Sequence, residues 1–197
     1  VALSVELADD EHGAETARAM LDDLLVVEAA PAESAVAPVP AVDAATAQAA
    51  QAAYAGHRFH PFPTCFACGT ARDEGDGLRI FPGRVADDQE GRTRVAATWT
   101  PDPSLGGDAA SLPVTWAALD CIGGWAGDLE ERLMVLGSMT ARVRDLPRIG
   151  EEHVVVGAAR GSSGRRTFTA ASLYAADGRL LGTAEHVWIA VSAEDFA

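Results

Sequence analysis

The chain has 197 residues, of which 48% are hydrophobic, and its formal net charge is −14. This length suits one domain with a substantial core and an appendage. The negative charge argues against binding to nucleic acid or to anionic membranes, because both need a basic field. No uncharged apolar run approaches the roughly 18 residues of a membrane span, and the acidic start does not resemble a secretory leader. Three cysteines, an odd count, do not suggest a disulfide framework, so we expect a cytoplasmic protein.

Residues 1–30 allow two structures. Apolar side chains between 17 and 25 fall at helical spacing, which predicts an amphipathic helix. Alternatively, Val1, Leu3, Val5 and Leu7 alternate as in a strand, and residues 14–30 resemble the later segment 168–185, with an Asp-centred turn in each. We prefer strands, which would make this extension a partial second copy of the main domain.

Residues 31–55 are rich in alanine and proline and contain few large apolar side chains. We therefore expect a connector that buries little surface and leads into a short helix over about 42–54. The main domain is expected over 56–197.

The main domain contains one strong helix signal, Leu112–Ala126, which is apolar at helical spacing and carries a single acid, Asp120. Alternating or apolar runs bounded by turn residues predict strands over 78–81, 93–99, 134–144, 152–160, 166–175 and 180–191. Turns at 161–164 and 177–178 would join the last three strands as hairpins. Short antiparallel strands around one long helix indicate an α+β domain.

Four features in this order resemble the hotdog-fold acyl-CoA thioesterases of the phenylacetate type. They are the segment CFACG at 65–69, the segment GLRIF at 77–81, the helix with Leu119 and Asp120, and the strands with the turn at 177–178. The resemblance covers roughly residues 60–191. It implies a hotdog fold, in which an antiparallel sheet wraps around one central helix and two protomers pair. It also implies an acyl-CoA-type thioester as substrate, bound at the interface of a homodimer, and no cofactor.

Asp120 is the expected catalytic residue. A carboxylate in so apolar a segment loses solvation, so it must be compensated, reached by solvent or used. Thioester hydrolysis needs an activated water and a polarised carbonyl, and an acid on a helix together with the N–H groups at a helix start can supply both. The alternative is a structural acid that is bonded to backbone groups or to an arginine from the sheet.

The start of this helix departs from the family pattern. The family usually has His-Gly-Gly there, whereas this chain has Ser111, Leu112 and Pro113. Proline has no N–H, so we assign the carbonyl-polarising donor to Leu112, with Ser111 as the N-cap. By the family's spacing, Ser138 would support the attacking water, whereas a slip of one residue would place Gly137 there. The alternative role of Ser138 is that of an ordinary strand serine.

Two groups of residues are expected to bind substrate. Small residues on the helix would leave room beside the acid, and the group on that face is Trp116, Gly123 and Gly124. Close packing of helix on sheet is the alternative role of the two glycines. Arginines around the turn at 161–164 would hold the phosphates of coenzyme A, and they are Arg160, Arg165 and Arg166. A solvated hairpin tip is the alternative there.

His57, His60, Cys65 and Cys68 have the residue types of a zinc site. However, the spacing from His60 to Cys65 is short for a zinc finger, two prolines intervene, and the resembling family keeps this cysteine pair without needing metal. We therefore expect no metal site and interpret the pair as packing residues. Cys121 should point away from Asp120 into the core.

These observations predict a thioesterase-like hydrolase that cleaves a small-to-medium acyl-CoA thioester, with Asp120 activating water. The alternatives are a non-catalytic hotdog protein that binds an acyl group or another small ligand, and a purely structural dimer module. The sequence lacks the Gly-x-Ser-x-Gly elbow of serine hydrolases, a P-loop and a dinucleotide fingerprint.

Overall fold

The computed structural model describes the chain except for residues 1–2, 10–12, 14, 34–35, 193 and 195–197. The chain divides into two compact units, Val1–Ala35 and Val36–Ala197. No helix in the described ranges is long and apolar enough to cross a membrane.

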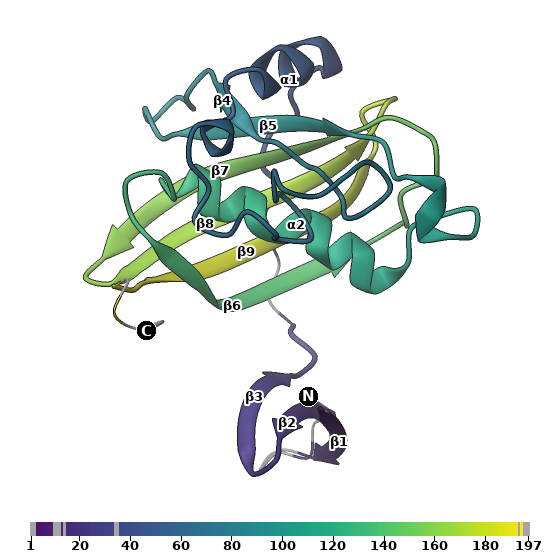
Figure 1. Cartoon of the computed structure of the whole chain (residues 1–197), viewed down its shortest axis with the longest axis vertical. Helices are drawn as coiled ribbons and strands as arrows, with labels where there is room; N and C mark the ends of the chain where they lie inside the picture. The colour runs from purple at the N-terminus through teal and green to yellow at the C-terminus, as the bar shows by residue number, and fades with distance from the viewer. Residues whose placement is uncertain (1–2, 10–12, 14, 34–35, 193, 195–197) are drawn as a thin grey trace. The chain divides into compact units, whose positions relative to one another are not determined.

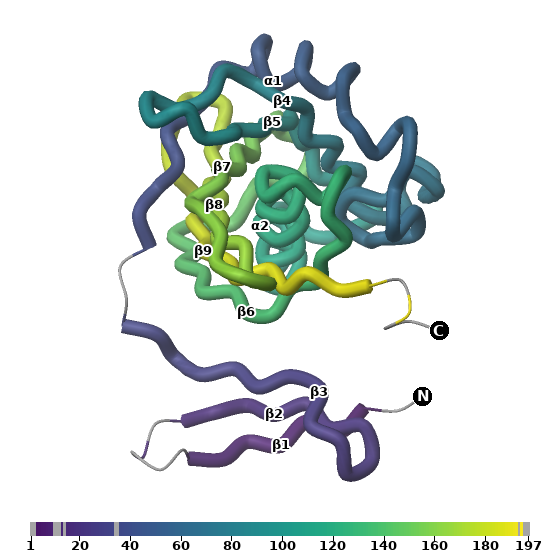
Figure 2. The backbone as a smooth tube through the Cα atoms, turned by 90° about the vertical axis from the view of Figure 1, so that its left-hand side faces the viewer, coloured from purple at the N-terminus to yellow at the C-terminus, as the bar shows by residue number. Residues whose placement is uncertain are grey.

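The first unit is a three-stranded antiparallel sheet of β1 (Ser4–Asp9), β2 (Glu15–Leu21) and β3 (Leu24–Ala29) (Figure 2). It therefore contains strands, the structure we preferred, and no helix over 15–29. Asp22 turns the chain between β2 and β3 with a φ of 52°, a left-handed conformation that aspartate tolerates better than most residues. Val1, part of the predicted alternation, lies outside the described residues.

The second unit is built on a six-stranded antiparallel sheet in the order β4-β5-β7-β8-β9-β6 (Figure 1). Its strands are β4 (Gly83–Val85), β5 (Arg94–Trp99), β6 (Met134–Val143), β7 (His153–Ser163), β8 (Arg166–Ala175) and β9 (Leu180–Ala190). One long helix, α2 (Leu112–Ala126), lies against the sheet, which curves around it (Figure 2). The core between them includes the fully buried Leu119, Ile122, Leu173 and Leu181. The expected α+β architecture is confirmed.

The opposite face of the sheet is partly covered by residues 36–51, which end in the short helix α1 (Ala44–Gln51) beside β4 and β5 (Figure 1). Val39 is fully buried there, and its N–H donates to Ser172 Oγ at 2.8 Å. A Cβ on Gly83 would lie 1.7 Å from the carbonyl oxygen of Ala50, so glycine lets α1 approach β4. The compact unit thus begins within the segment that composition predicted to be a connector, because small side chains such as Ala47 pack closely on this face of the sheet.

Residues 78–81 do not form the predicted strand. Leu78 and Ile80 are buried, as the alternation indicates, but Arg79 between them has a φ of 53°. The Leu78 N–H donates to the Phe66 carbonyl at 2.8 Å, and the Ile80 N–H donates to the Ala67 carbonyl at 2.9 Å. The segment is therefore hydrogen-bonded to the preceding loop and not to the sheet.

Candidate functional site

Asp120 lies in the middle of α2 and is partly buried. Its Oδ1 atom is inaccessible to solvent and has no hydrogen-bond partner among the residues that the structure describes. Burial raises the pKa of Asp120 to about 6, and the nearby Cys65 contributes to the increase. No backbone group or arginine within the described ranges therefore bonds to this oxygen.

A buried polar network holds the helical turn next to Asp120 against the sheet. His186 of β9 bonds through Nε2 to the Leu119 carbonyl at 3.0 Å and through Nδ1 to Thr169 Oγ1 at 3.1 Å. Trp188 Nε1 donates to the same Thr169 hydroxyl at 3.1 Å. Burial lowers the pKa of His186 to about 4, so the ring is neutral at physiological pH. This network was not predicted from the sequence, although Thr169 and His186 occupy inward positions of two predicted strands.

The two glycines of α2 do not leave room for a substrate, contrary to the sequence-based expectation. A Cβ on Gly123 would lie 2.6 Å from His186 Nδ1, and one on Gly124 would lie 3.1 Å from the Trp188 ring. The sheet fills the space beside both residues, so they serve close helix–sheet packing. Trp116, one turn before Asp120, remains 38% exposed and is available to a ligand or a partner.

The start of α2 offers free backbone donors. Ser111 is the N-cap but its side chain makes no capping hydrogen bond. The first intrahelical bond runs from Thr115 N–H to the Ser111 carbonyl at 2.9 Å, so the N–H groups of Leu112 and Val114 have no acceptor within the helix. Leu112 and Asp120 are eight residues apart, a separation of about 12 Å along the axis.

The structure places Ser138 on the wrong face of the sheet to assist Asp120 within one chain. Ser138 pairs with Val187 and Met139 pairs with His186, whose ring faces α2. Ser138 therefore points to the opposite face and is exposed. The cause is a β-bulge at Gly137, because one extra residue reverses the alternation of side chains beyond it.

The three arginines have different environments. Residues 162 and 163 belong to β7, so the hairpin turns at Gly164 and Arg165 and not over the predicted 161–164. Arg160 lies at a bulge in β7 and lines a cavity of about 410 Å³ together with Ser138. Arg165 Nε donates to the Ala190 carbonyl at 2.9 Å, whereas Arg166 is exposed at the start of β8. Only Arg160 of the three lines this cavity.

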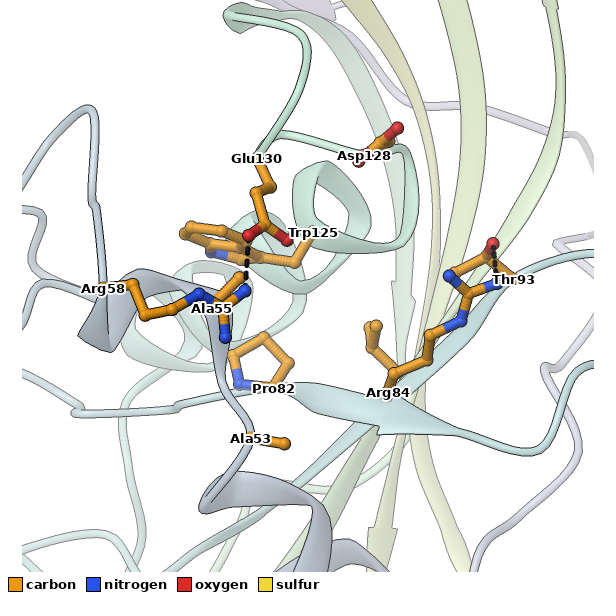
Figure 3. A pocket seen from close by; sticks show the side chains of 10 residues that line it. Ala53, Ala55, Arg58, Pro82, Arg84, Thr93, Trp125, Asp128 and Glu130 are labelled. Carbon is orange, nitrogen blue, oxygen red and sulfur yellow. Dashed lines mark hydrogen bonds and ion pairs between the residues drawn. The ribbon is translucent and has the colours of Figure 1, made fainter.

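A second cavity, of about 320 Å³, lies near the end of α2 (Figure 3). Arg58 pairs with Glu130 at 2.5 Å there, and Arg84 donates to Thr93 Oγ1 at 3.2 Å. The exposed Asp128 also lines this cavity, whereas Asp120 does not. The cavity therefore does not contain the candidate base.

Cys68 lies in the core, and Cys65 and Cys121 pack against it, as the sequence indicated, but the meeting of the three cysteines was not predicted. Cys121 lies with its sulfur 3.3 Å from that of Cys65, and these two sulfurs and that of Cys68 all lie within 4.8 Å of one another. His57 is exposed and its ring contacts Tyr54 instead.

No family model matches this chain, and no curated protein is similar to it in sequence. Solved structures do resemble it. Zebra fish thioesterase superfamily member 2 is 13% identical with a TM-score of 0.51, over 66% of this chain and 94% of that one. The E. coli PaaI protein from the phenylacetic acid degradation operon is 8% identical with a TM-score of 0.47, over 54% of this chain and 80% of that one.

The thioesterase superfamily protein RHA08564 is 20% identical with a TM-score of 0.45. The match covers 49% of this chain and 48% of RHA08564, so it spans about half of that protein. Identities this low establish the fold alone. The fold expected from the sequence is confirmed: this chain has the hotdog fold, as does zebra fish thioesterase superfamily member 2.

Proposed function

We propose that the second unit is a thioester hydrolase for small-to-medium acyl-CoA-type substrates, with Asp120 as the base. The observation that carries this proposal is the buried, unpartnered Oδ1 of Asp120 on the central helix. A carboxylate whose pKa is about 6 is ionised at neutral pH and is a stronger base than an ordinary aspartate. The hotdog fold, shared with zebra fish thioesterase superfamily member 2, supports the same reaction class.

The reaction begins when Asp120 takes a proton from a water molecule whose oxygen attacks the thioester carbonyl. The carbonyl becomes an oxyanion, which accepts a hydrogen bond from the Leu112 N–H. Collapse of the tetrahedral intermediate breaks the C–S bond, and the proton passes from Asp120 to the leaving thiolate. The free acid and the thiol are the products.

One chain cannot supply both groups to the same carbonyl, because Asp120 and Leu112 are separated by about 12 Å along α2. A two-fold pair of chains removes this difficulty, since it can bring the start of one helix near the middle of the other. Leu112 is 51% exposed and, with Trp116 one turn later, forms an apolar stripe available to a second copy. We therefore propose a homodimer with two shared sites.

Arg160 is the arginine we retain for the phosphates of coenzyme A, because it lines the cavity of about 410 Å³ and Arg165 and Arg166 do not line it. Ser138 lines the same cavity, so its proposed role changes from catalysis to contact with the ligand.

The release of thiol from a panel of acyl-CoA thioesters tests this function. Asp120→Asn should reduce turnover by roughly 100-fold or more, because the amide keeps the volume but accepts no proton. Asp128→Asn is the matched control, since Asp128 is an exposed acid just beyond the same helix. Unchanged turnover in Asp120→Asn would contradict the assignment.

The alternative function is binding of an acyl group or small ligand without catalysis. It is favoured by one observation, Pro113, which removes an N–H that the family's helix start would have. A wild-type protein that binds acyl-CoA thioesters but releases no thiol from any of them would support this alternative.

A further inference from the structure

All three cysteines of the chain meet at one place. Cys65 and Cys68 come from the loop that precedes β4, and Cys121 comes from α2, more than fifty residues later. The sulfurs of Cys65 and Cys121 are 3.3 Å apart, and all three sulfurs lie within 4.8 Å of one another. Packing alone does not require every thiol of a protein to converge in this way.

The sulfur of Cys68 is surrounded by N–H donors. Trp125 Nε1 lies 3.5 Å from it, and His60 Nε2 lies 3.4 Å from it and 3.1 Å from the Cys68 carbonyl oxygen, so this N–H is shared between the two acceptors. His60 Nδ1 accepts the Phe62 N–H at 3.0 Å, so the ring proton is on Nε2, which faces Cys68. Hydrogen bonds from N–H groups to sulfur stabilise a thiolate and are typical of the surroundings of metal-bound cysteines.

We propose that Cys65, Cys68 and Cys121 bind one zinc ion as three thiolates. Zinc–sulfur bonds of about 2.3 Å in a tetrahedral site place the sulfurs about 3.8 Å apart. This is slightly more than the 3.3 Å between the sulfurs of Cys65 and Cys121 and falls within the 4.8 Å that bounds the whole cluster. A Cys-x-x-Cys pair is a suitable half-site, and Cys121 supplies the third ligand. Each S–H bond is replaced by an S–Zn bond, and the protons pass to solvent.

His60 acts as a positioning residue for Cys68 and not as a zinc ligand, because its Nε2 carries the proton. Cys65 and Cys121 are only partly buried, so a water molecule can take the fourth position. The ion would tie the loop carrying Cys65 and Cys68 to α2 next to Asp120. It would stabilise the protein by linking these two segments, whether or not the protein hydrolyses thioesters.

The test uses the full chain, purified under reducing conditions, exposed to Zn²⁺ and freed of excess ion by gel filtration. We expect one zinc per chain by elemental analysis and a lower melting temperature after chelation. Co²⁺ in place of Zn²⁺ should produce tetrahedral ligand-field bands and a thiolate-to-cobalt charge-transfer band, which Zn²⁺ abolishes. These spectra need no variant, so they remain decisive if a cysteine variant fails to fold.

Cysteine variants identify the ligands. Cys121→Ser and Cys68→Ser should each lose stoichiometric zinc, whereas the control His57→Gln should keep it, because His57 is exposed and outside the cluster. His60→Gln should weaken zinc binding about 10- to 100-fold without removing the charge-transfer band, as expected for a group that acts through a ligand.

Two results would overturn the proposal. One is a wild-type protein that holds substoichiometric zinc and shows no charge-transfer band with Co²⁺. The other is a Cys65–Cys121 disulfide, detected as a cross-linked peptide by mass spectrometry, that persists in protein kept under reducing conditions.

Discussion

The two faces of the six-stranded sheet are covered in different ways. The inner face is covered by α2 along its whole length, through large apolar side chains and the network around His186. The outer face is covered in part by residues 36–51, which contribute mainly small side chains around Val39 and Ala47. The inner cover carries the partly buried Asp120, whereas the outer cover leaves the cavity with Ser138 and Arg160 open.

The inner face should be the more sensitive to an added methyl group. Gly123→Ala would place Cβ 2.6 Å from His186 Nδ1, and the buried ring has no space to move. We expect the free energy of unfolding to fall by about 3 kcal/mol, measured by urea denaturation. Gly124→Ala, where the nearest ring atom is 3.1 Å away, is the comparison and should cost less. Equal effects would show that the His186 network does not limit the approach of α2.

His186, on the inner face, should also make the free energy of unfolding depend on pH. The folded-state pKa of His186 is about 4, below the ordinary 6.5, so its contribution is complete above pH 6.5 and is lost as the pH falls toward 4. The loss is at most about 3 kcal/mol. Urea denaturation across this range should be done in an Asp120→Asn background, because the raised pKa of Asp120 acts with the opposite sign. Adding His186→Gln should flatten the dependence of the free energy of unfolding on pH. An unchanged slope would contradict the assignment of this dependence to His186.

On the outer face of the sheet, a substitution should lower the free energy of unfolding by less than Gly123→Ala does on the inner face. Ser172→Ala removes the acceptor of the Val39 N–H at 2.8 Å and leaves a buried donor unpaired. We expect a loss of about 1 kcal/mol in the free energy of unfolding. Ser162→Ala is the control, since Ser162 is exposed in the same sheet. A loss as large as that of Gly123→Ala would remove the difference between the two faces.

The smallest effect, a change in KM, is expected at the open cavity lined by Ser138 and Arg160. Arg160→Gln should raise the KM for an acyl-CoA thioester about two- to fivefold with little change in kcat, because a half-exposed arginine contributes modestly to binding a phosphate. Arg166→Gln is the matched control, since Arg166 lies outside this cavity. Equal KM values for the two variants would show that the coenzyme does not use this face.

The sequence by itself determined the elements whose pattern is local. The bounds of α2, 112–126, and of β8, 166–175, agree with the predicted ranges, because each is a regular run between clear start and stop residues. The order of these elements indicated an α+β domain, and the resemblance to a known family, carried by four features of the sequence, predicted the hotdog fold. Asp120 could be singled out as the candidate base from the sequence, because it is the one acid in an otherwise apolar helical run.

Only the tertiary structure decided what depends on register and on distant contacts. One bulge at Gly137 moved Ser138 to the other face, and spacing counted along the chain does not reveal such an insertion. Cys121 met Cys65 because the loop folds back onto α2, and Gly123 proved to be a packing residue because His186 comes from a strand over sixty residues away. Periodicity reports which side of an element is buried, but the partner on that side is set by how the elements pack.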